Sequence, residues 1–433
     1  MDRRLQDRYW RLVKEHAHAA SAIAAGIAAL PGGGKAFSET QALWRFVNND
    51  RVRLPALIEP LRQAAREQLR QRSEDYVLLV HDWSKLDYGA HTSKKDLVQV
   101  TNEQCWGYEL TTSLLVDAAQ GQPLAPMELQ LRSQTGVHST RSDEIEAPRP
   151  HLEQILPVME ASRAWDLPGR IVHIIDREAD SLAHLREWTN GPEPQLILIR
   201  VDHRRNVTWR DASWSLPGIV ETLAAEGAFE PTRAVEFRGR PTVQHVAETT
   251  VVLEAKGRKR RGKGRPRILI PGAPVTMRLV VAQLRDDQQE VLAEWLLFTN
   301  VPAEVPASEA AQWYYWRWRI ESFFKLLKSA GLQADQWRQE SAPAVVRRLL
   351  MASMACVTVW RLQADGSAAS QEARQVLIRL SGRQMKRRAP ETAPALLAGL
   401  QVLLAMLDLL EHYSLNDLRR LAENTLPQFF PSG

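Results

Sequence analysis

The sequence has almost no cysteine: its 433 residues include only Cys105 and Cys356. Two such distant thiols, without a partner at metal-ligand spacing, argue against a disulfide framework and a structural zinc site. Long apolar runs are also scarce. The most apolar stretch, residues 395–410, contains Gly, Gln and Asp, so we expect it to be too short and too polar to span a bilayer. The N-terminus lacks a signal-peptide core, and we predict a cytoplasmic protein with no membrane partner.

Basic residues only slightly outnumber acidic ones, which gives a formal net charge of +5. The hydrophobic content of 44% and charged content of 25% are those of an ordinary globular protein, and the length fits two to four domains. The distribution of charge is more informative. Residues 256–267 read KGRKRRGKGRPR, a cationic run without an acid. Such a run is either a solvated loop, a localisation-like segment or a phosphate-binding surface.

Apolar periodicity separates helical from strand-like regions. Helices are predicted over residues 4–30, from Ser38 to Val47 and from about Pro55 to Arg72. Short apolar or alternating runs then predict strands. These strands are 77–80, 108–116, 127–131, 171–175, 196–201, 249–253, 277–282 and 295–299. A helix is expected near 150–164, another from Ser308 to about Ala330, and only helices after 341. Strands followed by alternating strands and helices indicate an α/β fold with a mixed sheet.

One helix has an unusual polar face. Residues 313–328 read WYYWRWRIESFFKLLK. At about 100° per residue, one acid, three bases and a tyrosine fall within roughly 80° of one another, opposite a thick apolar stripe. These five residues are Tyr314, Arg317, Glu321, Lys325 and Lys328. The face is either the solvated side of a core helix or a phosphate-binding surface around a single carboxylate.

Two aspartates follow apolar runs that predict buried strands: Asp82 after 77–80 and Asp176 after 171–175. Each is either a turn or helix cap, or one of the carboxylates that converge on divalent cations in phosphodiester chemistry. The nearby Glu178 and Asp180 are expected to cap or salt-bridge the following helix. His81 and His173 are interpreted as structural.

The spacing Tyr314, Arg317, Glu321, Lys328 is Y-x2-R-x3-E-x6-K. It resembles the signature of the cut-and-paste DDE transposases of bacterial insertion-sequence family four. The stretch DREAD, starting at Asp176, resembles the surroundings of that family's second carboxylate, and Asp82 resembles the first. The Trp-Ser that follows Asp82 departs from the family pattern. The resemblance covers about residues 36–335, and only weakly the last hundred.

The resemblance implies an RNase H-like catalytic core interrupted by a β-rich insertion, with N- and C-terminal helical domains. It implies that Asp82, Asp176 and Glu321 hold two Mg²⁺ ions, for which Mn²⁺ substitutes. The domains implied are a helical DNA-end-recognition domain (1–73), the first part of the core (74–201), the insertion (202–303), the core's last helix (304–338) and a helical oligomerisation domain (339–433).

Further residues are implied to bind DNA. Tyr314, Arg317 and Lys328 hold the transposon end, and the helical projection adds Lys325. Trp295 resembles the tryptophan that stacks on a flipped base; otherwise it is a core strand residue. Arg200 resembles a basic position beside the active site. The basic run contributes Arg258, Lys259, Arg260 and Arg261.

The implied function is cleavage of DNA at transposon ends, hairpin formation and strand transfer into target DNA. The partners are double-stranded transposon ends and target DNA, and the chain is expected to act as a homodimer, associated with the nucleoid when bound. Two alternatives remain: a domesticated DNA-binding protein without catalysis, and an RNase H-fold nuclease or resolvase.

Overall fold

The computed structural model describes residues 3–13, 41–72, 74–254, 257–260, 267–328, 330–383 and 391–425. The chain divides into two compact units. The helical unit comprises Met1–Leu57, Leu86–Trp106 and Phe323–Gly433, and the sheet unit comprises Ile58–Lys85 and Gly107–Ser322. Most of the segment predicted as the first part of the core and all of the predicted insertion therefore belong to one unit.

All eight predicted strands are confirmed, and several are longer than expected. The main sheet contains β1 (Tyr76–Asp87), β3 (Trp106–Asp117), β4 (Pro123–Ser133), β5 (Gly136–Ser139), β6 (Arg170–Ile175), β7 (Leu196–Arg200), β8 (Asn206–Trp209), β9 (Ala212–Ser215), β10 (Glu230–Phe237), β11 (Arg240–Leu253), β14 (Val275–Arg285) and β15 (Val291–Thr299). Of the basic run, residues 257–260 and 267 lie in a separate two-stranded antiparallel sheet formed by β12 (Gly257–Arg260) and β13 (Arg267–Ile270), and the rest lies outside the described residues.

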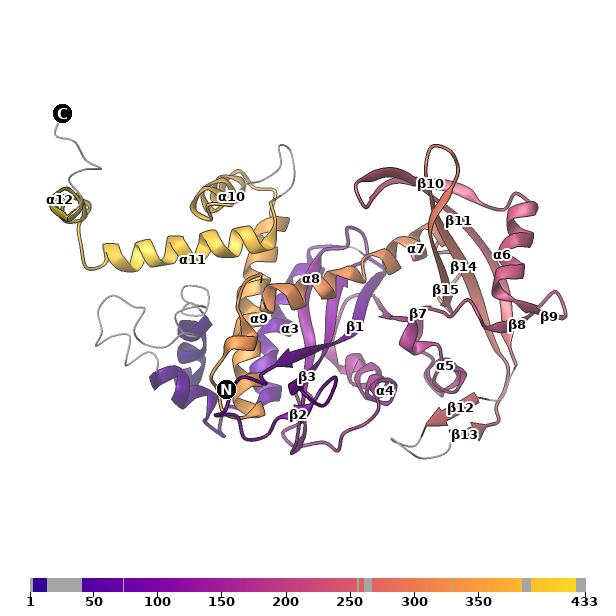
Figure 1. Cartoon of the computed structure of the whole chain (residues 1–433), viewed down its shortest axis with the longest axis horizontal. Coiled ribbons are helices and arrows are strands. Elements are labelled where there is room, and N and C mark those ends of the chain that lie inside the picture. Colours follow the sequence, from indigo (N-terminus) through magenta and orange to yellow (C-terminus); the bar gives the residue numbers. More distant parts are fainter. Residues whose placement is uncertain are drawn as a thin grey trace. The chain divides into compact units, whose positions relative to one another are not determined.

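The sheet is mixed, with the order β5-β4-β3-β1-β6-β7-β15-β14-β11-β8-β9. Strands β1, β6 and β7 are parallel neighbours, whereas β15 runs antiparallel to β7 and continues the sheet into β14 and β11. Figure 1 shows these last three strands side by side. Parallel strands end at the same edge of a sheet, so residues that follow β1 and β6 come close together there.

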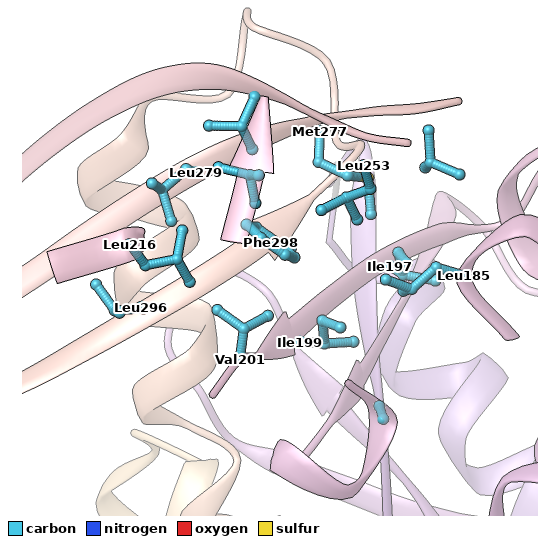
Figure 2. Close-up of a cluster of buried hydrophobic side chains, with 14 of the residues drawn as sticks. Leu185, Ile197, Ile199, Val201, Leu216, Leu253, Met277, Leu279, Leu296 and Phe298 are labelled. Carbon is cyan, nitrogen blue, oxygen red and sulfur yellow. The ribbon is translucent and has the colours of Figure 1, made fainter. Parts of the chain in front are cut away.

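Helices of the sheet unit cover this sheet: α4 (His151–Ser162), α5 (Leu182–Thr189), α6 (Leu216–Ala225) and α7 (Ala307–Tyr315). A single cluster of buried apolar side chains joins α5 and α6 to the sheet, and Figure 2 shows part of it. Ile199 of β7, Leu279 of β14 and Phe298 of β15 are fully buried in this cluster. The expected insertion therefore shares one core with the end of the parallel strands.

The helical unit holds the chain's last helices, as expected after residue 341. Its helices are α9 (Ala342–Ala364), α10 (Ala368–Leu380), α11 (Ala393–Leu410) and α12 (Leu415–Thr425). Helices α3 (Leu54–Arg70) and α8 (Trp318–Leu327) have residues in both units. The unit also contains β2, a strand of two residues, Val98–Gln99. Residues 3–13 and 41–47 are also helical. The rest of the helix predicted over 4–30, and Ser38, lie outside the described residues.

Residues 395–410 were expected to be too short and too polar to span a bilayer, and this expectation was wrong. Helices α9 and α11 are both long and apolar enough to cross a membrane by length and composition, with mean hydropathies of 1.4 and 1.9. The apolar window of α9 is 89% buried within the protein, which is typical of a core helix, but that of α11 is only 22% buried. Helix α11 therefore exposes an apolar surface that the described part of this chain does not cover.

Candidate active site

The strand register brings two of the predicted acids together. In the register of β1 and β6, Val80 lies opposite Ile174 and His81 lies opposite Ile175. The residue that follows in the chain is an aspartate in both cases, and the register places the two aspartates side by side. Asp82 continues β1, and Asp176 directly follows β6 and begins a 3-10 turn, where its carboxylate accepts the Arg177 N–H. Asp176 therefore caps the turn, which was one of the two roles considered from the sequence. Its other carboxylate oxygen, Oδ2, stays available for other partners.

Arg317 lies among all three predicted acids. Its guanidinium nitrogens are 3.0 Å from Asp82 Oδ2, 3.4 Å from Asp176 Oδ2 and 3.1 Å from Glu321 Oε1. The arginine side chain is only 7% exposed, whereas the three carboxylates keep 20 to 36% exposure. Three acids from distant parts of the sequence therefore surround one buried cation.

The charges of this cluster depend on one another. Burial raises the pKa of Asp82, and the neighbouring Asp176 and Glu321 raise it further, while the Trp83 N–H and Arg317 oppose the shift. Burial alone would lower the pKa of Arg317, but Tyr314 and the acids outweigh it and raise that pKa above its usual value. Three carboxylates at this spacing repel one another, and a positive charge between them offsets that repulsion. Arg317 supplies that charge.

The donor set suits a hard divalent cation, because carboxylate oxygens are the ligands Mg²⁺ prefers. In the arrangement described, however, no three acidic, histidine or cysteine side chains among the described residues are grouped closely enough to hold one ion. The guanidinium of Arg317 occupies the centre instead. A metal fits these residues only if Arg317 moves away and the carboxylates close on the space it leaves.

The prediction of one continuous helix from Ser308 to about Ala330 was wrong. The chain forms α7 and α8 with a tight turn at Trp316 and Arg317, where the Arg317 N–H donates to Tyr314 O at 3.0 Å. Trp316 packs on Gly121, whose φ is +67° and where a Cβ would come within 2.3 Å of the indole. The break directs Arg317 at the acids and buries Trp316. Tertiary packing thus overrides the local helical preference.

The predicted cationic face is consequently divided. Tyr314 is buried and donates from its hydroxyl to Asp176 Oδ1 at 3.3 Å, and burial raises its pKa. Lys325 is exposed near the end of α8, and Lys328 is half-buried in the turn that follows α8; both belong to the helical unit. The apolar stripe behaves as predicted: each of its six residues is buried, namely Trp313, Trp316, Ile320, Phe323, Phe324 and Leu327.

A buried histidine pair lies directly beneath the aspartates. His81 Nδ1 is 2.9 Å from Ser113 Oγ, and His81 Nε2 is 3.0 Å from His173 Nδ1. Burial lowers the pKa of both rings, that of His173 to about 3, so the pair is neutral. These contacts join β3, β1 and β6 one residue before Asp82, which fixes the backbone that carries the acid.

No local sequence pattern predicts the second charged cluster that lies beside Asp82. His151, at the start of α4, is 3.1 Å from Glu109 and 3.0 Å from Glu178, and its ring stacks on Trp83 with centroids 4.6 Å apart. Burial opposes protonation, but the two carboxylates raise the pKa of His151 to about 9. Glu178 therefore pairs with α4 and not with the helix after β6. Trp83, which departs from the family pattern, forms part of this cluster.

The other predicted residues are less closely grouped. Asp180 pairs with Arg205 rather than with the following helix. Trp295 is half-buried on β15 and lines a narrow slot together with Tyr314. Arg200, at the end of β7, pairs in register with Leu297 and acts electrostatically on Tyr314. Of the basic run, Arg258, Lys259 and Arg260 lie on β12, and Arg261 lies outside the described residues.

Comparison with known proteins adds little. No protein-family model and no curated protein matches the chain. Among solved structures, the chain is similar to the piggyBac transposase in a synaptic complex with hairpin DNA, studied by cryo-electron microscopy. The TM-score is 0.37 with 9% identity, over 98% of this chain and 76% of that one. This likeness is too low to establish a common fold, so function has to be argued from the site.

Proposed function

We propose that the chain is a DDE-type DNA transposase that binds transposon ends and cleaves and joins DNA strands. The observation that carries the proposal is the convergence of Asp82, Asp176 and Glu321 on the single buried guanidinium of Arg317. One acid is enough to pair with a structural arginine. Three partly exposed acids around one arginine form a cluster of the kind found at functional sites, and such a cluster is suited to bind metal cations in place of the arginine. The order β4-β3-β1-β6-β7, with β1, β6 and β7 parallel, supports an RNase H-like core.

Asp82, Asp176 and Glu321 would hold two Mg²⁺ ions, or Mn²⁺, which supply Lewis-acid activation of the attacking and leaving oxygens. The chain's own groups do the positioning. The strand ends and the histidine pair fix the two aspartates, and the first turn of α8 fixes Glu321. Once Arg317 leaves the acids, its planar guanidinium is suited to bind a DNA phosphate with two parallel hydrogen bonds.

The surroundings of the acids would hold the DNA end. Tyr314 connects Asp176 to the slot lined by Trp295, where an aromatic base could stack. Arg200 adds positive charge near Tyr314. Lys325, Lys328 and residues 258–261 of the basic run would contact the phosphate backbone, and binding would then weaken steeply with salt.

Incubation with DNA from either side of the coding region tests the proposal. We expect Mg²⁺-dependent nicking at a defined end, followed by joining of the cleaved end to a target plasmid. Binding without nicking would support the domesticated DNA-binding protein, and nicking without joining would support a nuclease or resolvase. Nicking that persists in EDTA would contradict a metal-dependent reaction.

The apolar surface of α11 supports the homodimer. Val402, Met406 and Leu410 are 39 to 47% exposed and recur every fourth residue, so they form one stripe along the helix. We expect the double substitution Met406→Glu and Leu410→Glu to split the complex of two chains and two DNA ends into complexes of one chain and one end, as measured by the mass in sedimentation. Burying two new charges in a dimer interface is strongly unfavourable.

Leu421→Glu is the matched control, because Leu421 is 56% exposed on α12 and lies outside the stripe. This variant should keep the wild-type stoichiometry. An unchanged mass for the α11 double variant would exclude α11 as the interface. A single wild-type chain per pair of ends would reject the dimer itself.

A further inference from the structure

The slot beside the acids has an aromatic wall and a cationic wall. Four strands and the α7–α8 segment form it, and its aromatic residues are Trp295, Tyr314, Tyr315 and Trp318. Arg233 of β10 and Gln244 of β11 provide its polar groups. All of these residues belong to the sheet unit, and Tyr314 also donates to Asp176, so the slot directly adjoins the acid cluster.

One polar group in this slot has no partner. Arg233 donates from Nε to Gln244 Oε1 at 2.9 Å, which orients the guanidinium plane. Its Nη2, however, is shielded from water and makes no hydrogen bond within the described part of the chain. A buried donor without an acceptor is unfavourable. Such a group in a folded protein calls for an explanation, and an acceptor supplied by a ligand is the one that fits a donor lining a slot.

A base would need side chains at the mouth of the slot to move. The centre of a water molecule can occupy only about 20 Å³ inside it, which is too little for a base. Tyr315 and Trp318 are 45% and 51% exposed, so their rings can turn into solvent. The Tyr315 ring lies 5.4 Å from the Arg233 guanidinium. When that ring turns away, a flat ligand can take its place against Arg233 and stack on Trp295.

We propose that Arg233 selects the base that enters this slot, and that it favours keto bases, thymine and guanine, over adenine and cytosine. An arginine donates only. Where thymine has O4 and guanine has O6, both acceptors, adenine and cytosine have an amino group, and two donors repel each other. Adenine N7 and cytosine N3 and O2 also accept hydrogen bonds, so the preference requires Arg233 to face the keto or amino position itself. The inference rests on the proposed function, because it takes an unpaired base of the DNA end as the ligand. It adds the base identity that the slot accepts.

The test uses the full-length protein and duplexes with one unpaired nucleotide: thymine, guanine, adenine, cytosine or an abasic site. Fluorescence anisotropy gives each Kd. We expect the wild type to bind the keto bases on the order of tenfold more tightly than the amino bases. Arg233→Met should make the four bases equal, yet still bind each more tightly than the abasic site, because Trp295 remains for stacking. Trp295→Ala should instead lose the preference over the abasic site.

Arg238→Met is the matched control. Arg238 lies in the same β10–β11 hairpin, is exposed, and does not line the slot. It should lower affinity for all duplexes equally and keep the preference for keto bases. Circular dichroism melting checks that each variant is folded.

Two results would overturn the inference: an unchanged keto preference in Arg233→Met, or equal wild-type binding of all four bases. Failure of the proposed function is measured separately, as absence of Mg²⁺-dependent nicking on the same duplexes. A keto preference that depends on Arg233 in a protein that does not nick would sustain the base selectivity and reject the transposase.

Discussion

Asp176→Asn should lower Mg²⁺-dependent nicking on the order of 10³-fold while leaving DNA binding nearly intact. The substitution preserves the size of the side chain and an oxygen that can accept the Arg177 N–H, so the turn after β6 should fold. It removes the charge that faces Arg317. Loss of one ligand carboxylate costs several kcal/mol of transition-state stabilisation, and each 1.4 kcal/mol is a factor of ten in rate. Single-turnover nicking and gel-shift titration measure the two effects.

Glu178→Gln provides the comparison, because Glu178 lies two residues further along the same turn. It pairs with His151, is 61% exposed, and does not face Arg317. We expect its nicking rate to stay within about threefold of the wild type, since an exposed ion pair contributes little. Equal activity of Asp176→Asn and the wild type would remove Asp176 from the reaction. Equal loss in both variants would indicate damage to the turn instead.

The strands of the sheet could be predicted because their signal is local. Residues 77–80 and 171–175 are short apolar runs, and such runs are typical of strands covered on both faces. Parallel pairing of β1 and β6 then places the residues after each run at one edge of the sheet. Each aspartate was a candidate because it follows such a run, and the resemblance to the transposase family joined the two; the strand pairing gives the physical reason why they lie together.

The details of the site depend on contacts between distant residues, and no local pattern reveals them. The break between α7 and α8 arises where Trp316 packs on Gly121, almost two hundred residues earlier. A helical projection assumes an unbroken helix, so it assigned Arg317 and Tyr314 to an open DNA-binding face. Both are buried against the acids. The pairing of His151 with Glu109 and Glu178 is similarly invisible, because none of the three is near another in sequence.

Under the proposed function, Arg317 would give the site two states. With the guanidinium among the acids, it offsets part of their negative charge, and the described residues include no group of three ligands placed to hold a metal ion. With the guanidinium withdrawn onto a phosphate, the three carboxylates would be left to bind metal. DNA and metal would then each favour the withdrawn arginine, so binding of one should strengthen binding of the other. Such coupling would keep the protein from cleaving before the DNA end is seated.

Arg317→Gln should therefore destabilise the metal-free protein and increase its response to Mg²⁺. Removing one partner of a buried ion pair costs about 3 to 5 kcal/mol, and we expect about 3 kcal/mol because the acids keep some contact with water. Urea unfolding in EDTA measures this loss. Mg²⁺ at about 100 times its Kd contributes roughly 2.7 kcal/mol, which should restore most of the lost stability. The wild type should gain less, since its arginine competes with the ion.

Arg319→Gln separates this effect from the general loss of an arginine. Arg319 donates to Gly121 O at 2.7 Å and forms no ion pair with the acids within the described ranges. Its replacement should cost about 1 kcal/mol and leave the Mg²⁺ response at the wild-type value. If Arg317→Gln were as stable as the wild type in EDTA, the three acids would not depend on its charge. If Mg²⁺ stabilised both proteins equally, the guanidinium would not occupy the place of the metal, and the two-state arrangement would be rejected.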